Sequence, residues 1–340
     1  MRNVIVYLGP KLPKYVKKNI NYLSSTFPDQ KFVILIDHAK NYSKKKLKNV
    51  EIIRCQDPII SWSPANQILS KENHFKNDFW YKTLARFKVL EEYMKDNNES
   101  IMHIEADVLL SKNFPFDRVK LIDKKFGYCL VTDKQGIASL LYIKNYEAAK
   151  ILLHFSEELL GRDPKFTDMD ILGALYKEKQ EDVYILPTID SESVFLADSF
   201  KTYNTDIINN YSKFNGLFDA ATLGQYFFGL DRIHTNGFLK TKIYLPHHYV
   251  DPRKVNMIIS EGNFYAVTKD NKVEIYTLHL HSKINKFFSL NSKNLENFID
   301  NKKFKRVGTF SIVSYYNSKI YIFLHQIKKS AIFWTKKRVD

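Results

Sequence analysis

The chain has 340 residues, 44% of them hydrophobic and 14% aromatic, and its formal net charge is +15. This hydrophobic content excludes a disordered chain, and the length fits one large α/β domain or two modest ones. No apolar window reaches the roughly 20 residues that span a bilayer. Cys55 and Cys129 lie in apolar surroundings, which excludes a disulfide framework. We therefore expect a cytoplasmic protein with reduced thiols.

The first half of the chain alternates strand and helix patterns. Strands are predicted at residues 4–8, 31–36 and 50–54, a helix at 15–25, a basic turn at 44–48, and a long helix at 77–95 followed by a strand at 102–110. Such alternation is typical of an α/β fold with a Rossmann-like, mostly parallel central sheet flanked by helices.

The second half adds fewer helices and more turns. Strands are predicted at 126–131, 137–143 and 183–186, helices at 146–160 (closed by Gly161) and 168–179, loops with short elements at 190–215, and a small antiparallel meander at 255–259, 263–267 and 273–281. No internal repeat is present. We expect one main domain over residues 1–290 and a C-terminal extension over 291–340.

Two carboxylates interrupt the apolar strand predicted at 102–110. Glu105 and Asp107 are two residues apart and would point to the same side of a strand, where they can share one cation. Hard oxygen ligands suit Mg²⁺ or Mn²⁺, often together with substrate phosphates. The alternative is a strand end whose acids face solvent. Ligands of open α/β sheets bind at the carboxyl ends of strands, which favours the cation site.

A second polar cluster lies at the end of the predicted meander. His279 and His281 alternate with leucine, so both would point to one face, and paired histidines are common metal ligands. Lys283 follows as a point charge for phosphate oxygens. Two histidines do not close a metal site alone, but they could complete one begun by Glu105 and Asp107. The alternative is a pair of half-buried polar residues on an edge strand.

Other candidate residues lie on predicted helices. Lys82 and Arg86 are four residues apart, share a helix face and could contact a diphosphate, although a solvated face is the commoner outcome. Asp219 is a candidate functional carboxylate or the N-cap of a helix over 220–228. Asp168 stands at the start of another helix, which either Thr167 or Asp168 would cap; alternatively Asp168 is a base or a sugar-hydroxyl acceptor.

Several functional classes lack their motifs. No Gly-x-Ser-x-Gly nucleophile elbow occurs, and Glu105 and Asp107 are too close in sequence to flank a glycosidic bond. No zinc finger or RNP-type pattern supports nucleic-acid binding, which would depend on the net charge alone. The remaining alternative to an enzyme is a basic protein that binds nucleic acid or anionic membrane without catalysis. The excess of lysine is also compatible with a biased genome.

The ordered motifs resemble those of nucleotide-sugar glycosyltransferases of GT-A fold, in particular a bacterial group. The shared segments are Glu105-Ala106-Asp107, the Phe-Asp-x-Ala-x-x-Gly-Gln-Tyr segment at 218–226 and the Leu-His-x-His-Ser-Lys segment at 278–283. The chain departs from the group in Glu105, where Asp is commoner, and in Arg-Ile-His after residue 231, where a Pro-containing turn is expected.

The resemblance implies a hexosyltransferase-type enzyme that takes a nucleoside-diphosphate sugar and Mn²⁺ or Mg²⁺. Asp107 would hold the metal directly, and Glu105 would reach it through water or bind the donor ribose. His281 would be the later metal ligand, with His279 the second choice, and Lys283 would contact the diphosphate. Arg86 or Lys82 would assist, while Asp168 and Asp219 are candidates for a catalytic base.

Bulky apolar and basic residues alternate near the C-terminus, at 320–338. Trp334 beside Lys336, Lys337 and Arg338 suits an interface with anionic lipid. The alternative is a helix packed on the domain, with its basic tail in solvent. A peripheral position on the inner membrane face would suit a glycan or lipid-linked acceptor of surface polysaccharide or lipopolysaccharide type.

Overall fold

The computed structural model describes residues 1–9, 11–37, 47–56, 58, 62, 79–190, 192, 195–198, 205–229, 248–268, 271–283 and 285–288. The C-terminal extension at 291–340 and most of the basic turn at 44–48 lie outside these residues. The division of the chain at residue 290 therefore stays a prediction. No helix in the described part of the chain is long and apolar enough to cross a membrane.

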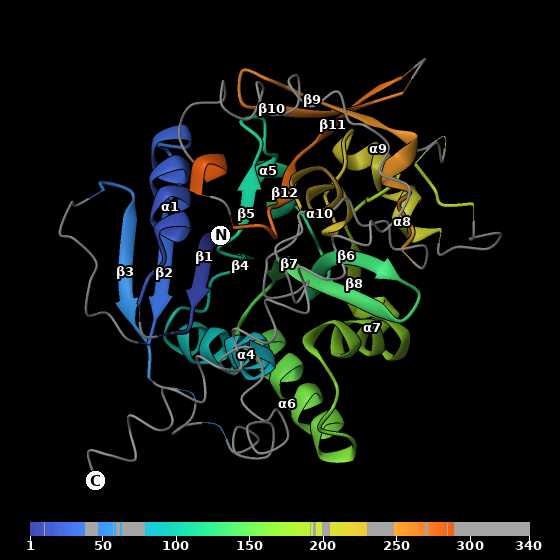
Figure 1. The fold of residues 1–340 in the computed structure, drawn as a ribbon. Helices are drawn as coiled ribbons and strands as arrows, with labels where there is room; N and C mark the ends of the chain where they lie inside the picture. The colour runs from blue at the N-terminus through green and yellow to red at the C-terminus, as the bar shows by residue number, and fades with distance from the viewer. Residues whose placement is uncertain are drawn as a thin grey trace, which may run out of the picture.

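A seven-stranded sheet forms the centre of the molecule, in the order β3-β2-β1-β4-β7-β6-β8 (Figure 1). The strands are β1 (Arg2–Tyr7), β2 (Phe32–Ile36), β3 (Val50–Arg54), β4 (Ile101–Ile104), β6 (Phe126–Thr132), β7 (Gln135–Ile143) and β8 (Val183–Ile185). Only β7 runs antiparallel to its neighbours β4 and β6; the other pairs are parallel. The predicted mostly parallel sheet is confirmed.

Helices cover both faces of this sheet (Figure 1). Right-handed crossovers place α1 (Lys14–Thr26), which links β1 to β2, and α4 (Phe79–Asp96), which links β3 back to β4, on opposite faces. The helices α6 (Tyr146–Arg162) and α7 (Asp168–Glu178) pack with α4. The prediction that Gly161 closes α6 was wrong: the helix continues to Arg162 and ends at the extended residue Asp163.

The strand predicted at 102–110 is in fact two strands in different sheets. β4 pairs with β1 and β7, whereas β5 (Val108–Leu110) pairs with β12 (Thr277–His279). Between them the chain turns, and the amide of Val108 donates to the carbonyl oxygen of Glu105 at 3.0 Å. Glu105 and Asp107 therefore lie in a tight connection, and the prediction that one strand orients both was wrong.

The predicted meander is also divided. β9 (Asn256–Ser260), β10 (Asn263–Val267) and β11 (Lys272–Ile275) form an antiparallel sheet, and β12 leaves it to pair with β5. The division falls at Tyr276, whose amide donates to Leu217 and whose carbonyl accepts from Ser111, so its backbone is bonded outside the meander. β12, which ends at His279, therefore lies beside β5 (Figure 1), which begins directly after Asp107.

Short helices complete the described chain: α5 (Phe116–Lys120), α8 (Asp206–Asn209), α9 (Tyr211–Phe214), α10 (Thr222–Phe228), η1 (Gln180–Asp182), η2 (Pro252–Lys254) and η3 (Asn285–Phe288). Of these, α10 matters most for the site. An added Cβ at Gly224 would lie 2.1 Å from the carbonyl oxygen of His279, so glycine is what allows α10 to pack directly on β12.

Candidate functional site

The connection that carries Glu105 and Asp107 is held by α1 and β7. The buried side chain of Asn19 on α1 donates to the carbonyl oxygens of Ala106, at 3.1 Å, and Val108, at 2.8 Å. The amide of Glu105 donates to Ser139 on β7 at 3.0 Å. These bonds satisfy the backbone of the turn and direct its two acidic side chains to the carboxyl edge of the parallel strands.

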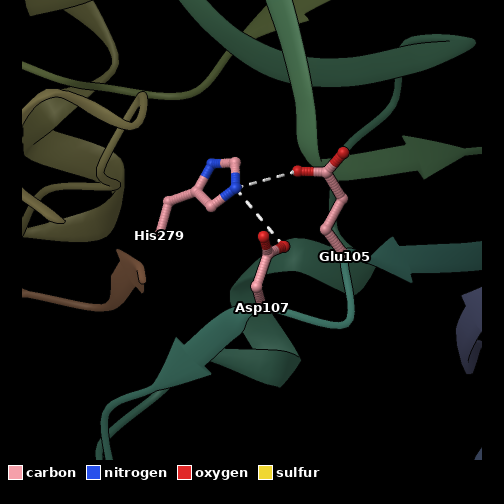
Figure 2. A group of neighbouring side chains, drawn as sticks. All are labelled: Glu105, Asp107 and His279. Carbon is pink, nitrogen blue, oxygen red and sulfur yellow. Dashed lines mark ion pairs between the residues drawn. The ribbon is translucent and has the colours of Figure 1, made fainter. Parts of the chain in front are cut away.

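His279 stands between the two carboxylates. Its Nε2 atom lies 3.3 Å from Glu105 Oε2 and 3.3 Å from Asp107 Oδ1 (Figure 2). One ligand atom from each of the three residues falls within 4.8 Å of the others. Residues 174 positions apart in the chain thus present three potential ligand atoms to one point.

The segment after β12 adds further polar groups. Lys283 Nζ lies 3.4 Å from Asp107 Oδ2, and the amide of Leu280 donates to the carbonyl oxygen of Asp107 at 2.8 Å. The ring of His281 is stacked obliquely beside that of His279, with 4.5 Å between centroids. The sequence ranked His281 above His279 as a ligand; the fold brings His279 against both acids and leaves His281 beside it.

The cluster is electrostatically coupled. Burial disfavours the charged form of Asp107, but His279, Lys283 and His281 outweigh it and hold the pKa of this carboxyl well below its usual range. Burial likewise opposes protonation of His279, yet the adjacent carboxylates of Asp107 and Glu105 raise its pKa above the ordinary value. The acids and the imidazole thus each favour the charged form of the other.

Arg86 connects this cluster to α7. Its guanidinium is buried and donates one hydrogen bond to Glu105 and one to Asp168. Burial raises the pKa of the Asp168 carboxyl in spite of the attraction of Arg86. The sequence predicted Thr167 or Asp168 as the N-cap of α7. The N-cap is Thr167, which forms a capping box with Asp170. Asp168 is left to face Arg86.

A cavity of about 950 Å³ opens over the cluster. Of the residues singled out in the sequence, those that line it are Lys82, Arg86, Glu105, Asp107, Asp168, His279, His281 and Lys283. The described lining also includes residues that the sequence did not single out: Tyr7, Lys11, Met169 and His248. The rule that ligands bind at carboxyl ends of strands would have found Tyr7, at the end of β1. His248 follows a segment without a recognisable pattern.

Asp219 does not line the cavity. Its carboxylate accepts hydrogen bonds from the amides of Leu223, Gly224 and His279, at 2.9, 2.8 and 3.0 Å. Burial nevertheless raises its pKa. It therefore links the first turn of α10 to β12. This role is close to that of a helix N-cap, the alternative that the sequence left open for this residue.

The donor set suits a divalent cation. Two carboxylates and one imidazole nitrogen match the ligand preferences of Mn²⁺. Mg²⁺ prefers oxygen ligands and would be held mainly by the two carboxylates. Within the described residues, Nδ1 of His279 makes no hydrogen bond, so that the ring is oriented by the carboxylates alone. Glu105, Asp107 and His279 therefore fit a metal site.

Comparison with known proteins gives distant structural similarities only. No family model matches the chain, and no curated protein matches it in sequence. Galactosyltransferase LgtC in complex with donor and acceptor sugar analogs is 16% identical, with a TM-score of 0.43 over 57% of this chain and 77% of that one.

Mouse xyloside xylosyltransferase 1 is 11% identical, with a TM-score of 0.39 over 56% of this chain and 86% of that one. The glycosyltransferase GlyE of Streptococcus pneumoniae TIGR4 is 12% identical, with a TM-score of 0.36 over 54% and 44%. Because these similarities are so low, the site is interpreted from its own residues.

Proposed function

We propose that this protein is a metal-dependent glycosyltransferase that moves a sugar from a nucleoside-diphosphate donor to a glycan or glycolipid acceptor. The proposal depends above all on the convergence of Glu105, Asp107 and His279 within a cavity of about 950 Å³. That volume lies in the range of pockets for nucleotide-sized ligands. Lys283 and Arg86, next to the acids, supply the positive charge that a diphosphate requires.

The bound cation, Mn²⁺ or Mg²⁺, would offset negative charge on the departing nucleoside diphosphate. Asp107 and His279 would hold it, with Glu105 as a third ligand kept in position by Arg86. Lys283, which contacts Asp107, would bind diphosphate oxygens from the opposite side. Lys82 lines the same cavity and would assist.

Asp168 is the better of the two predicted carboxylates for contact with substrate. It lines the cavity and Arg86 orients it, so its free lone pairs suit a sugar hydroxyl. The carboxylate of Asp219 is already bonded to three backbone amides. We therefore assign sugar binding or proton acceptance to Asp168 and a positioning role to Asp219.

Calorimetry with Mn²⁺ and a panel of nucleoside diphosphates tests the proposal. We expect nucleotide binding that depends on the metal and that Asp107→Asn weakens by at least about 100-fold, because a direct ligand is lost. The control is Asp117→Asn, in which an aspartate with a 92% exposed side chain on α5 loses the same charge and leaves binding unchanged. Binding without metal, or equal binding by both variants, would instead favour a basic protein that binds anions without catalysis.

A surface-polysaccharide or lipopolysaccharide-type acceptor at the inner membrane face remains part of the proposal, and it concerns residues 320–338. Sedimentation with anionic vesicles separates the possibilities: a chain truncated after Lys319 should bind them more weakly than the intact chain. Equal sedimentation of the two would remove the membrane from the proposal and leave a soluble glycan as acceptor.

A further inference from the structure

A second hollow, of about 360 Å³, lies beside the cavity. Its walls are the β6–β7 hairpin turn and the facing side of the α6–α7 connection and α7. The lining residues are Asp133, Lys134, Asp163, Lys165, Phe166, Asp170, Gly173, Ala174 and Lys177, and we call this hollow the lysine groove.

The lysine groove and the cavity share their two walls. β6 runs parallel to β8 and antiparallel to β7, which is itself antiparallel to β4, so the hairpin turn lies at the same carboxyl edge as Glu105. Val131 and Asp168 line the cavity, while Asp133 and Asp170, each two positions further along, line the groove. The two hollows are therefore lined by neighbouring residues of the same hairpin and the same helix.

The walls of the groove are fixed by close packing. An added Cβ at Gly173 would lie 1.9 Å from the carbonyl oxygen of Lys134, so the helix touches the hairpin backbone. The hydroxyl of Tyr249 donates to Asp133, and the side chain of Gln135 donates to Asp170 at 2.9 Å. The groove is thus a preformed feature of the fold.

The lysine groove contains three aspartates and three lysines, and the two sets differ in whether other described side chains and amides already bind them. Asp133 accepts from Tyr249, Asp163 from the amide of Lys165 and Asp170 from Gln135 and Thr167, so each carboxylate is engaged. In contrast, no ion pair with another described residue involves the ammonium groups of the three lysines. Among the residues that the structure describes, these exposed ammonium groups meet no acceptor, and they lie beside one partly exposed aromatic ring, Phe166.

We propose that the lysine groove binds an anionic part, carboxylate or phosphate, of the acceptor glycan. The three lysines would donate to the anion and to hydroxyl oxygens, and Phe166 would offer an apolar face to a sugar ring. The inference rests on the proposed function, since it takes the groove as the continuation of the acceptor side of the cavity. Three lysines around a short groove fit an oligosaccharide better than the long basic track of a nucleic-acid site.

The test uses the full chain without donor, at low ionic strength, and calorimetric titration with tetragalacturonate, a mannose tetrasaccharide phosphate and neutral maltotetraose. We expect one of the two anionic sugars to bind about tenfold more tightly than maltotetraose, and the difference to shrink with added salt. Which anionic sugar binds identifies carboxylate or phosphate as the ligand chemistry. Equal affinities for charged and neutral sugars would overturn the proposal.

Matched variants locate the binding. The triple substitution Lys134→Gln, Lys165→Gln and Lys177→Gln should abolish the preference for the anionic sugar. The control triple, Lys48→Gln, Lys95→Gln and Lys112→Gln, removes the same charge from exposed lysines that line neither hollow and should retain it. Equal behaviour of both triples, or tighter binding of a single-stranded oligonucleotide than of either anionic sugar, would contradict a glycan groove.

Two more variants test separately the contribution of the Phe166 ring and that of the metal site to sugar binding. Phe166→Leu should weaken charged and neutral sugars alike, which also serves if the triple variant folds poorly. Asp107→Asn should leave binding of the anionic sugar unchanged, since the groove lies outside the metal cluster. In the unsubstituted chain, absence of metal-dependent nucleotide binding together with the anionic-sugar preference would refute the proposed function alone. Metal-dependent nucleotide binding without that preference would refute the groove alone.

Discussion

Two buried aspartates flank His279, and they differ in what compensates their charge. Asp107 faces the imidazole of His279 and the ammonium of Lys283, both side chains that can change partners. Asp219 faces the backbone amide of the same histidine and two amides of α10. Each aspartate therefore contacts one end of His279, one through the ring and the other through the main chain.

The difference shows how the partners of a buried carboxylate determine its use. Side-chain partners lower the pKa of Asp107 and can yield to a cation, so its charge is available for chemistry. Backbone partners are fixed, and burial raises the pKa of Asp219 in spite of them. Asp219 thus fixes the backbone of His279, while Asp107 contacts the imidazole ring of the same residue. The following predictions would break or sharpen this contrast.

Loss of Asp219 should cost the most stability. Asp219→Ala leaves three buried amides without an acceptor, and we expect a loss of roughly 3–5 kcal/mol in the free energy of unfolding. Asp107→Ala should cost less, because Lys283 is partly exposed and His279 keeps Glu105 as a partner. Urea denaturation measures both. Equal losses would show that the two aspartates serve the same purpose.

The histidines on either side of the acids should respond oppositely to pH. Burial, with a smaller contribution from Arg86, lowers the pKa of His103 to about 3, while the pKa of His279 is raised. Since unfolded His103 binds a proton near pH 6.5 and folded His103 does not, its contribution to stability is complete above that pH. It is lost as the pH falls towards 3, by roughly 3 kcal/mol between pH 7 and pH 4.

His103→Leu removes this titration and should flatten the acid limb of stability by that amount, measured by urea denaturation of the metal-free protein. The variant also loses the bond from Nδ1 to the Val4 carbonyl, at 3.2 Å, which lowers stability at every pH without changing the slope. An unchanged slope between pH 7 and pH 4 would mean that His103 is protonated in the folded protein.

The contact of α10 with β12 should tolerate no side chain. Gly224→Ala would place a Cβ 2.1 Å from the carbonyl oxygen of His279, and we expect a loss of about 2–3 kcal/mol together with weaker metal binding. At Gly161 nothing lies within 4 Å of an added Cβ, so Gly161→Ala should instead stabilise α6 by about 0.4–1 kcal/mol. Thermal unfolding and Mn²⁺ titration of both variants provide the comparison.

At Arg86 we expect a moderate effect, on metal binding. Arg86→Lys cannot donate to Glu105 and Asp168 at once, and a misplaced Glu105 should weaken Mn²⁺ binding about tenfold. Arg2→Lys is the matched control, since Arg2 pairs with the exposed Glu99 far from the cavity. If Mn²⁺ affinity is the same in both variants, Glu105 is not a ligand and the cluster reduces to Asp107 and His279.

The sequence predicted most elements because their hydrophobic periods are local. β3 was predicted with its observed bounds, and α7 within one residue, since each is a short pattern bounded by polar residues. Errors fell where the backbone changes sheets. Nothing local distinguishes a continuous strand at 102–110 from two strands joined by a turn, because the choice depends on whether β7 or β12 pairs with each residue.

The site shows the same division. Residue types and order alone singled out Glu105, Asp107, His279, His281, Lys283 and Arg86, since carboxylates and histidines within apolar segments are costly unless they are compensated. Which of them meet was decided by tertiary structure. The pairing of β5 with β12 places His279 against Glu105 and Asp107, and the packing of α10 directs Asp219 to backbone amides instead of the cavity. The sequence determines which acidic and basic side chains the protein contains. Contacts between residues distant in the chain determine which of these charges are paired with fixed backbone groups and which face the cavity.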